Sequence, residues 1–457
     1  MSGEWSESKI ILKFTGEDIN KIKSNNIDII VRCGLGILKG EILSSSKFGV
    51  ISFHHGDNRI NRGGPSGFWE VLNNEPSSGF IIQRLTEELD GGPVLFRGNI
   101  MTSNTWLSNN DKLLSKSYFF MKRLLLEVAL NDCLPNLEAP TLHDRPLYKI
   151  NSNLILLKYI CKVLIPILGR RISSLLRGSY IGRWSIAYAK HDNFNKSLWR
   201  YKEIENPRGR FLADPFVFKK NGRTVIFAED YFFNDSKGRI SAIEIKQSNE
   251  EFLGVVLEED FHLSFPYIFE SEGIVFMIPE SSNNKDIRLY ECIDFPTQWK
   301  LKAILMKGIS AADTMVFKKF DKWFMLTNIC SAGVNDHQSE LHIFWSSSLE
   351  SSEWVSIKCG NPVIFHSESA RNGGFFIHDG SLYRINQIHG KYHYGKGFGI
   401  NIINVLDEFD YKETRLKNVE AHFKKNIFSS HHFNAYEDIA VVDYCRSINL
   451  KSILSES

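Results

Sequence analysis

Short apolar runs separated by glycine-rich and polar turns divide the first 130 residues into segments the size of strands and helices. Ile27–Val31 and Gly49–Phe53 are continuous apolar runs, which are typical of strands buried on both faces of a sheet. Phe80–Leu85 is a third run of this kind, and apolar residues then recur at helical spacing over Leu113–Leu130. This order of segments predicts an α/β domain over residues 1–130.

From residue 184 onward the pattern changes to pairs of short apolar strands joined by a turn, and this unit recurs five times. The five strand pairs begin at Ala213, Ser264, Ala312, Arg371 and His431, which places equivalent positions about 50 to 60 residues apart. One blade of four strands takes about 40–50 residues. The repeat therefore predicts an all-β five-bladed β-propeller over residues 184–457.

The fifth strand pair is followed by too few residues for two further strands, so the outer strands of that blade must come from another part of the chain. Trp184–Ala189 and Leu198–Ile204 precede the first repeat and are the candidates for these strands. A blade that combines strands from both ends of the region closes the ring and leaves no exposed sheet edge.

Residues 131–183 lie between these regions and contain an amphipathic stretch. Its apolar part, Leu154–Leu168, is shorter than the roughly 20 residues that cross a membrane. Polar residues and a proline interrupt or follow it: Lys158, Lys162, Pro166, Arg170, Arg171 and Arg177. We therefore expect no integral membrane segment. One interpretation is a linker helix between domains, and the other is peripheral membrane contact through residues 154–177.

Composition narrows the classes of function. The 55 Lys and Arg residues almost balance the 53 Asp and Glu residues, which excludes a strongly basic nucleic-acid-binding surface as the main feature. The seven cysteines are scattered, and neither a CxxC motif nor zinc-type Cys/His spacing occurs. This usage is typical of a reduced, cytoplasmic protein with no metal site.

The most specific motif of the first region lies between Gly49 and Leu95. Ser52-Phe53-His54 ends a strand, Arg62-Gly63-Gly64-Pro65 forms a loop, and Leu89-Asp90-Gly91-Gly92 forms a turn. In this order and spacing the region resembles the formyltransferase family, which includes methionyl-tRNA formyltransferase and the sugar N-formyltransferases. The resemblance implies a Rossmann-like domain that is short at its start.

The resemblance also implies a chemistry, which is transfer of a formyl group from N10-formyltetrahydrofolate to a primary amine. It assigns His54 as the general base and Asp90 as the carboxylate that orients it, roles that suit an imidazole with an ordinary pKa of about 6.5. Ser52 stands where the family has an asparagine that stabilises the oxyanion. The implied cofactor-binding residues are Arg32, Gly34, Leu35, Gly36, Ile37, Leu38 and Gly91.

The repeats of the second region resemble two related propeller groups: the arabinanase-type glycoside hydrolases, and the N-terminal domain of glucosamine inositolphosphorylceramide transferases. The segments ADPFVF, SFPYIFE and ADTMVF and the run Arg371–Gly395 carry this resemblance. Residues that open the innermost strands of a propeller converge on one mouth of its channel. The predicted sugar-binding residues are Asp214, Glu270, Asp313, Arg371, Asn372 and His432.

A glycosidase needs two carboxylates across the scissile bond. Asp214 matches the hydrolase base, and Glu229, Glu270 and Asp313 compete for the role of the acid.

Together these features favour a cytoplasmic enzyme that formylates the amine of an amino sugar, nucleotide-linked or lipid-linked, while the propeller binds the carbohydrate. The near-neutral charge argues against tRNA as the acceptor. One alternative is a glycosidase or glycosyltransferase that acts through the propeller and carries a vestigial formyltransferase region. The other is a sugar-binding protein without catalysis.

Overall fold

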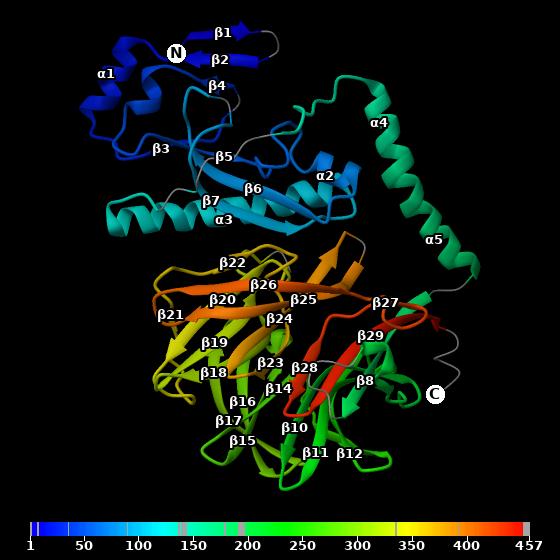
Figure 1. Cartoon of the computed structure of the whole chain (residues 1–457). Coiled ribbons are helices and arrows are strands. Elements are labelled where there is room, and N and C mark those ends of the chain that lie inside the picture. The colour runs from blue at the N-terminus through cyan, green and yellow to red at the C-terminus, as the bar shows by residue number, and fades with distance from the viewer. Residues whose placement is uncertain are drawn as a thin grey trace. The chain divides into compact units, whose positions relative to one another are not determined.

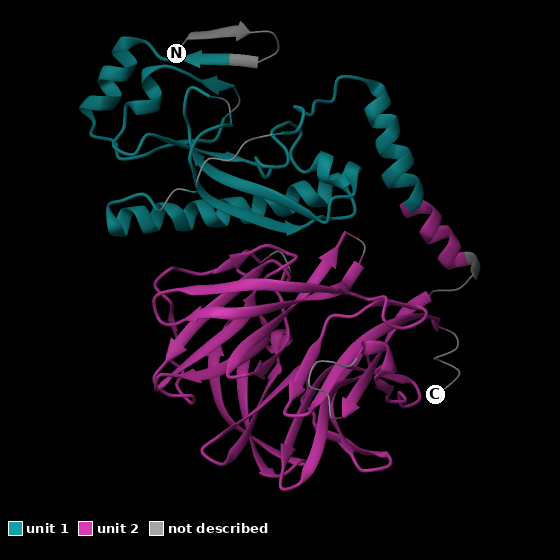
Figure 2. Ribbon diagram, viewed as in Figure 1, with its two compact units in different colours: residues 1–166 teal, residues 167–457 magenta. Residues whose placement is uncertain are grey.

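The computed structural model describes residues 2–6, 9–34, 36–88, 90–135, 138, 144–177, 180–190, 197–333, 336–391 and 393–450. The chain divides into two compact units, residues 1–166 and 167–457, which Figure 2 shows in different colours. The division falls within the segment 131–183 that the sequence marks as a linker. Each unit is described separately below.

Unit 1 is built on two small sheets (Figure 1). The four-stranded sheet has the order β3 (Ile30–Arg32), β5 (Val50–His54), β6 (Ser77–Arg84) and β7 (Val94–Met101). The three-stranded sheet contains β1 (Ser2–Ser6), β2 (Lys9–Lys13) and β4 (Ile37–Leu38). The helices of unit 1 are α1 (Gly16–Ser24), a 3-10 turn (Glu41–Ser44), α2 (Phe68–Asn73) and α3 (Trp106–Asn131).

The apolar runs of the sequence become the strands of the four-stranded sheet. The central strand β6 is buried along almost its whole length, as its continuous apolar pattern predicts. The sheet is mixed, however, because β3 and β5 are parallel whereas β6 is antiparallel to both β5 and β7. The doubly wound, Rossmann-like sheet that the resemblance implies is therefore not seen among the described residues. No apolar run of the sequence predicted β7, which returns beside β6 through a short connection of the kind that only antiparallel strands allow.

Unit 2 is almost entirely β structure, and the part of it that the structure describes contains five sheets (Figure 1). Four of them consist of strands that follow one another along the chain. Their strands are β10 (Arg210–Lys220), β11 (Arg223–Phe232), β12 (Lys237–Ile245) and β13 (Glu250–Leu257); β14 (Ser264–Ser271), β15 (Ile274–Glu280), β16 (Asp286–Asp294) and β17 (Gln298–Lys307); β18 (Ala311–Lys319), β19 (Lys322–Ile329), β20 (Glu340–Ser346), β21 (Val355–Ser356) and β22 (Ile364–Phe365); and β23 (Asn372–His378), β24 (Ser381–Gly390), β25 (His393–Leu406) and β26 (Tyr411–Glu420).

The fifth sheet joins strands from both ends of unit 2. Its order is β27 (Ile427–Ser429), β29 (Ile439–Asn449), β8 (Tyr180–Lys190) and β9 (Lys202–Glu203), and β28 (Phe433–Tyr436) also pairs with β29. β8 runs antiparallel to β29 over its full length, from Tyr180 opposite Asn449 to Lys190 opposite Ile439. The expectation that Trp184–Ala189 completes the sheet of the last repeat is confirmed by this pairing.

The first strands of the repeats lie next to one another. β10 contacts both β14 and β28, and β18 contacts both β14 and β23, which in turn contacts β28. Aromatic side chains from these strands pack together, with the Phe216 ring 4.9 Å from that of Phe265 and the Tyr267 ring 5.4 Å from that of Phe375. These large buried rings hold the first strands in place, because each removes about 150–250 Å² from water.

Candidate functional site

A shared irregularity in the first strands positions the polar side chains of unit 2. In β10, β14, β18 and β23 the pairing with the next strand skips two residues at the same place in the repeat. The first skipped residues include Asp214 and Asp313, whose φ angles are 48° and 49°. A β-bulge of this kind turns a side chain out of the regular alternation of the strand. It therefore directs Asp214 and Asp313 toward the end of the strands.

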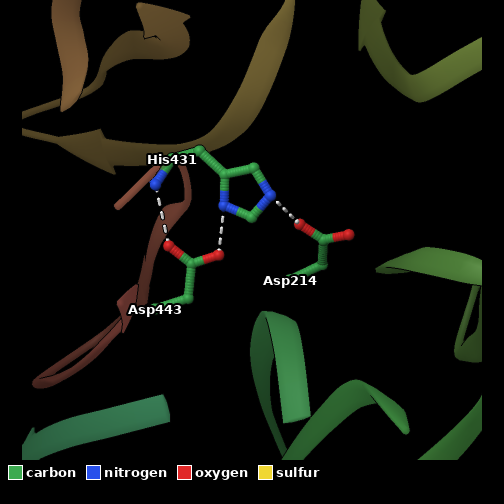
Figure 3. A group of neighbouring side chains, drawn as sticks. All are labelled: Asp214, His431 and Asp443. Carbon is green, nitrogen blue, oxygen red and sulfur yellow. Dashed lines mark hydrogen bonds and ion pairs between the residues drawn. The ribbon is translucent and has the colours of Figure 1, made fainter. Parts of the chain in front are cut away.

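The fifth sheet has two histidines at the equivalent place, between β27 and β28. The backbone N–H groups of His431 and His432 both donate to Oδ1 of Asp443, each at 2.9 Å. The other carboxylate oxygen of Asp443 contacts Nδ1 of His431, and Nε2 of His431 lies 3.5 Å from Oδ1 of Asp214 (Figure 3). Asp443, His431 and Asp214 thus form a buried row in which one imidazole links two carboxylates.

Aromatic rings fix the orientation of His431. The ring of Trp184 stacks on it at 4.1 Å, and the ring of Tyr394 meets it edge-on at 5.1 Å. Gly395 has a φ of 65°, and a Cβ atom there would lie 2.9 Å from Cβ of His431. A glycine is therefore required at this position for both the backbone conformation and the space beside the imidazole.

Asp313 belongs to a second, adjoining group. Nε of Arg371 donates to Oδ2 of Asp313 at 2.6 Å, and the guanidinium lies 3.7 Å from Oε2 of Glu280. Nδ2 of Asn372 donates to the backbone oxygen of Asp313 at 2.8 Å, and Nε2 of Gln387 donates to its carboxylate at 3.0 Å. Asp313 is thereby held as an ion-pair partner of the guanidinium.

Burial and mutual repulsion raise the pKa values of Asp214, Asp313 and Glu229. Burial raises the pKa of Asp214 to about 7, and Asp313 and Asp443 add to this rise against the opposing charge of His431. Burial raises the pKa of Asp313 to about 6 although Arg371 opposes it. Burial also raises the pKa of Glu229 well above its usual range, and the Asp214 carboxylate beside it raises it further. The site therefore offers both ionised and protonated carboxyl groups near neutral pH.

His431 is the titratable cation of the row. Burial lowers its pKa, but Asp443 and Asp214 outweigh burial and raise it above the ordinary value. We expect Asp443→Asn to lower the pKa of His431, measured by NMR titration of the ring. Because the pKa is raised in the folded state, the stability that His431 contributes is present below pH about 6.5 and is lost as the pH rises through the folded pKa. A ring pKa that is unchanged in Asp443→Asn would contradict this account.

The structure brings together five of the six predicted sugar-binding residues and leaves one apart. Asp214, Asp313, Arg371, Asn372 and His432 lie in the cluster, with His432 Nδ1 3.8 Å from Asp214. Glu270 lies outside this cluster, against the expectation that it converges there. It pairs with Val275 beside the hairpin turn, at the end of β14 away from the bulge, where it forms an ion pair of 3.0 Å with Lys220. There it lines a separate cavity of 680 Å³.

Sequence reasoning overlooked Asp443 and Glu280 as members of the cluster and left Glu229 undecided. A signal for all three exists, because the second strand of each repeat carries an acid or amide across from the bulge. Glu229 pairs with Ala213, Glu280 with Ser264, and Asn328 with Ala312. Asp443 holds the corresponding place opposite His432, to whose carbonyl its N–H donates.

Asp214, His431 and Asp443 also offer three ligand atoms of the kinds that bind cations, all within 4.8 Å of one another. In the structure each nitrogen of the imidazole faces one of the carboxylates, which is the arrangement of an ion triad (Figure 3). The expectation that the protein binds no metal stays a prediction.

Unit 1 has its own pocket, a cavity of 620 Å³ lined by almost all the residues predicted there. Nδ1 of His54 lies 3.4 Å from Oδ1 of Asp90, and its Nε2 lies 3.1 Å from the carbonyl oxygen of Asn61. Burial lowers the pKa of His54, but the hydrogen bond and charge of Asp90 and the Asn61 carbonyl together raise it. The predicted residues that line the cavity are Arg32, Gly34, Gly36, Ile37, Leu38, Ser52, His54 and Asp90.

Two of these residues have neighbours that the resemblance does not imply. Nδ1 of His54 faces the Asp90 carboxylate, and its Nε2 faces the carbonyl oxygen of Asn61. Oγ of Ser52 lies 3.4 Å from Nη1 of Arg32, which brings a guanidinium to the place where the resemblance implies an asparagine. Gly91 follows Asp90 in the turn, and Leu35 lies outside the described residues.

The fold and the cluster define unit 2 as an all-β unit, built from five repeats, with a buried polar site at the bulged end of its first strands. Residues 201–441 match the family described as "Glucosamine inositolphosphorylceramide transferase 1, N-terminal". The match spans more than half of the sequence, and the chain belongs to this family.

Two groups of relatives match parts of the chain. Glucosamine inositolphosphorylceramide transferase 1 of Arabidopsis thaliana is 34% identical over 234 residues, which are 49% of this chain and 30% of that protein. The chain thus spans less than a third of this relative's length. Methionyl-tRNA formyltransferase of Clostridium beijerinckii is 24% identical over 225 residues, covering 48% of this chain and 70% of that protein.

One solved structure to which this chain is similar is the catalytic domain of the Coprinopsis cinerea GH62 α-L-arabinofuranosidase. It is 11% identical with a TM-score of 0.40 and covers 57% of this chain and 96% of that chain.

Proposed function

We propose that the protein is a carbohydrate-active enzyme whose unit 2, a five-bladed β-propeller, binds a lipid-linked or nucleotide-linked sugar and cleaves or transfers its glycosyl group. One observation carries this proposal: Glu229 pairs across the strands with Ala213, the neighbour of Asp214, and burial raises the pKa of both carboxyl groups, that of Asp214 to about 7. A pair of carboxyl groups, one acting as acid and one as base, is what the exchange of a glycosidic bond requires. The name of the Arabidopsis relative, a transferase acting on an inositolphosphorylceramide, supports a sugar joined to a lipid through phosphate.

The residues of the cluster suggest separate roles as acid, base and supporting groups. Burial and the Asp214 carboxylate raise the pKa of Glu229, which favours its protonated form, and it can donate a proton to the leaving oxygen. Asp214, whose pKa burial raises to about 7, can accept the proton of the incoming hydroxyl when it is ionised. His431 carries the positive charge that favours the ionised form of Asp214, and Asp443 holds the imidazole in place. The guanidinium of Arg371 supplies the positive charge that would bind the phosphate of the sugar substrate.

The test is a direct assay of glycosyl exchange. Purified protein is incubated with lipid-linked and nucleotide-linked sugars and with aryl glycosides, and products are followed by mass spectrometry. We expect release or transfer of a sugar that depends on Asp214. Sugar binding by calorimetry without any turnover would instead assign unit 2 as a carbohydrate-binding unit.

A second candidate function is formyl transfer in unit 1, and the arrangement around His54 favours it. The pocket has a polar end at His54 and Asp90 and an apolar wall of Ile37, Leu38 and Leu85, which fits a folate ring with a reactive polar group. Bound N10-formyltetrahydrofolate would supply the formyl group. His54 would take the proton of the attacking amine, and Asp90 would orient the imidazole and stabilise its protonated form. The amine of a nucleotide-linked or lipid-linked amino sugar is the proposed acceptor, and the cytoplasm is the proposed location.

For this candidate we expect His54→Ala to lower folate-dependent formylation of an amino sugar about 10²–10⁴-fold, because the general base is lost. The reaction is followed with formyltetrahydrofolate and a panel of nucleotide-linked amino sugars. His378→Ala, at the last position of β23 in unit 2, serves as the control and should match the wild type. Equal rates in His54→Ala and the wild type, or no formylation across the panel, would refute the formyltransferase assignment.

A further inference from the structure

A long amphipathic helical run leaves most of its apolar residues in contact with water. It consists of α4 (Asn153–Tyr159), a π-helical turn (Ile160–Leu164) and α5 (Ile165–Arg177). In α5 the residues Ile165, Leu168, Ile172 and Leu175 follow one another at helical spacing and are 56%, 57%, 46% and 85% exposed. Leu154 and Leu157 of α4 are 74% and 55% exposed. Water contact on this scale is unfavourable for a folded protein unless another surface covers the helix.

One side of the run is attached to unit 1. Ile155 and Tyr159 pack against the aromatic cluster around Phe68, whose ring lies 5.2 Å from that of Tyr159. The hydroxyl of Tyr159 accepts a hydrogen bond of 2.9 Å from the backbone N–H of Trp106. The partly buried residues of α4 thus have packing partners, and Leu154 and Leu157 remain exposed.

The charge of the run is entirely of one sign. All its charged residues are basic: Lys158, Lys162, Arg170, Arg171 and Arg177. No acidic residue occurs in the sequence between Asp144 and Asp192, although the whole chain is almost neutral. An exposed apolar stripe accompanied only by positive charge is complementary to a lipid surface that carries anionic head groups.

Two other interpretations of the run, a membrane-spanning helix and a dimer formed by two copies of the helix, agree less well with the observations. No helix in the described part of the chain is long and apolar enough to cross a membrane. A second copy of the same helix would bring Lys158, Lys162 and Arg171 near like charges without an acidic residue to pair with them, which disfavours a helical dimer.

We propose that the helical run 153–177 lies in the plane of an anionic membrane surface, with its exposed leucines and isoleucines among the acyl chains and its basic residues at the head groups. No residue of this run lines either cavity or belongs to the buried cluster, so the proposal does not rest on either proposed activity. It would bring the protein to the membrane in which a lipid-linked sugar resides.

Vesicle co-sedimentation of the full chain tests this proposal. The vesicles are phosphatidylcholine alone, or phosphatidylcholine with about one third phosphatidylserine. We expect binding to the mixed vesicles at least tenfold tighter than to the neutral ones, and weakened by salt. The triple variant Ile165→Ser/Leu168→Ser/Leu175→Ser should lose this binding. The matched control is Leu107→Ser/Leu130→Ser on α3, whose leucines are 76% and 83% exposed, and it should bind like the wild type.

Charge-reversal variants test whether the basic residues contribute to membrane binding. Lys158→Glu/Lys162→Glu/Arg171→Glu should reduce binding to the mixed vesicles at least tenfold, whereas Lys300→Glu/Lys417→Glu on strands of unit 2 should not. Circular dichroism checks that each variant is folded. Equal binding by the serine triple variant and the wild type would overturn the proposal. The proposal would also be overturned if analytical ultracentrifugation showed concentration-dependent dimerisation of the protein. This holds if the same triple variant abolishes the dimer and lipid has no effect on it.

Discussion

Replacing Asp214 by asparagine is expected to reduce glycosyl transfer or hydrolysis about 10²–10⁴-fold, the usual contribution of a general base. Asparagine keeps the size of the side chain and can still accept a hydrogen bond from His431, so the cluster should stay assembled. The variant loses only the ability to take up a proton at neutral pH. Initial rates on the best substrate found for the wild type measure the effect.

The same substitution is expected to lower activity but to raise the stability of the protein at alkaline pH. Burial raises the pKa of Asp214 to about 7, so the folded state holds its proton more tightly than the unfolded chain does. The stability of the wild type therefore falls as the pH rises from about 4 to 7, because ionising a buried carboxyl is unfavourable. Asp214→Asn should be more stable than the wild type at pH 8, and the difference should vanish near pH 4. Thermal unfolding at both pH values measures it.

Asp379→Asn is the matched control for both measurements. This aspartate lies in the exposed turn after β23 with a φ of 47°, a conformation that asparagine tolerates well. It should leave activity and the pH dependence of stability unchanged. If Asp214→Asn kept full activity, the proposed role of the cluster in glycosyl chemistry would be wrong; loss of activity without a gain in stability at pH 8 would contradict the raised pKa.

The second large effect concerns Arg384, a guanidinium buried behind the cluster with 1% exposure. It makes two hydrogen bonds of 2.7 Å to Glu413, and its Nη1 donates to Oδ1 of Asn372 at 3.1 Å. Arg384→Met should destabilise unit 2 by about 3–5 kcal/mol, because it leaves a buried carboxylate without its partner. Denaturant unfolding followed by tryptophan fluorescence measures this loss.

Arg223→Met provides the control for Arg384→Met. Arg223 also makes two hydrogen bonds to one carboxylate, that of Glu244, each at 2.9 Å, but its side chain is 37% exposed. Water replaces the lost partner there, so we expect a change within about 1 kcal/mol. Equal losses in the two variants would show that burial does not govern the strength of these pairs. Since Arg384 also positions Asn372, partial unfolding should be checked before any activity of Arg384→Met is interpreted.

The sequence by itself determined the repeats of unit 2, the strands at its two ends that join in one sheet, and the motif whose His54 and Asp90 meet in one pocket. These features depend on local alternation and on spacing, and both are written along the chain. Only the tertiary structure decided that Glu270 lies at the other end of its strand, that Asp443 and Glu280 complete the cluster, and that β7 makes the first sheet mixed. Each of these depends on strand register and on burial. Register decides which end of a strand a side chain occupies, and burial decides whether a carboxyl group there is an ordinary acid or one that titrates near neutrality.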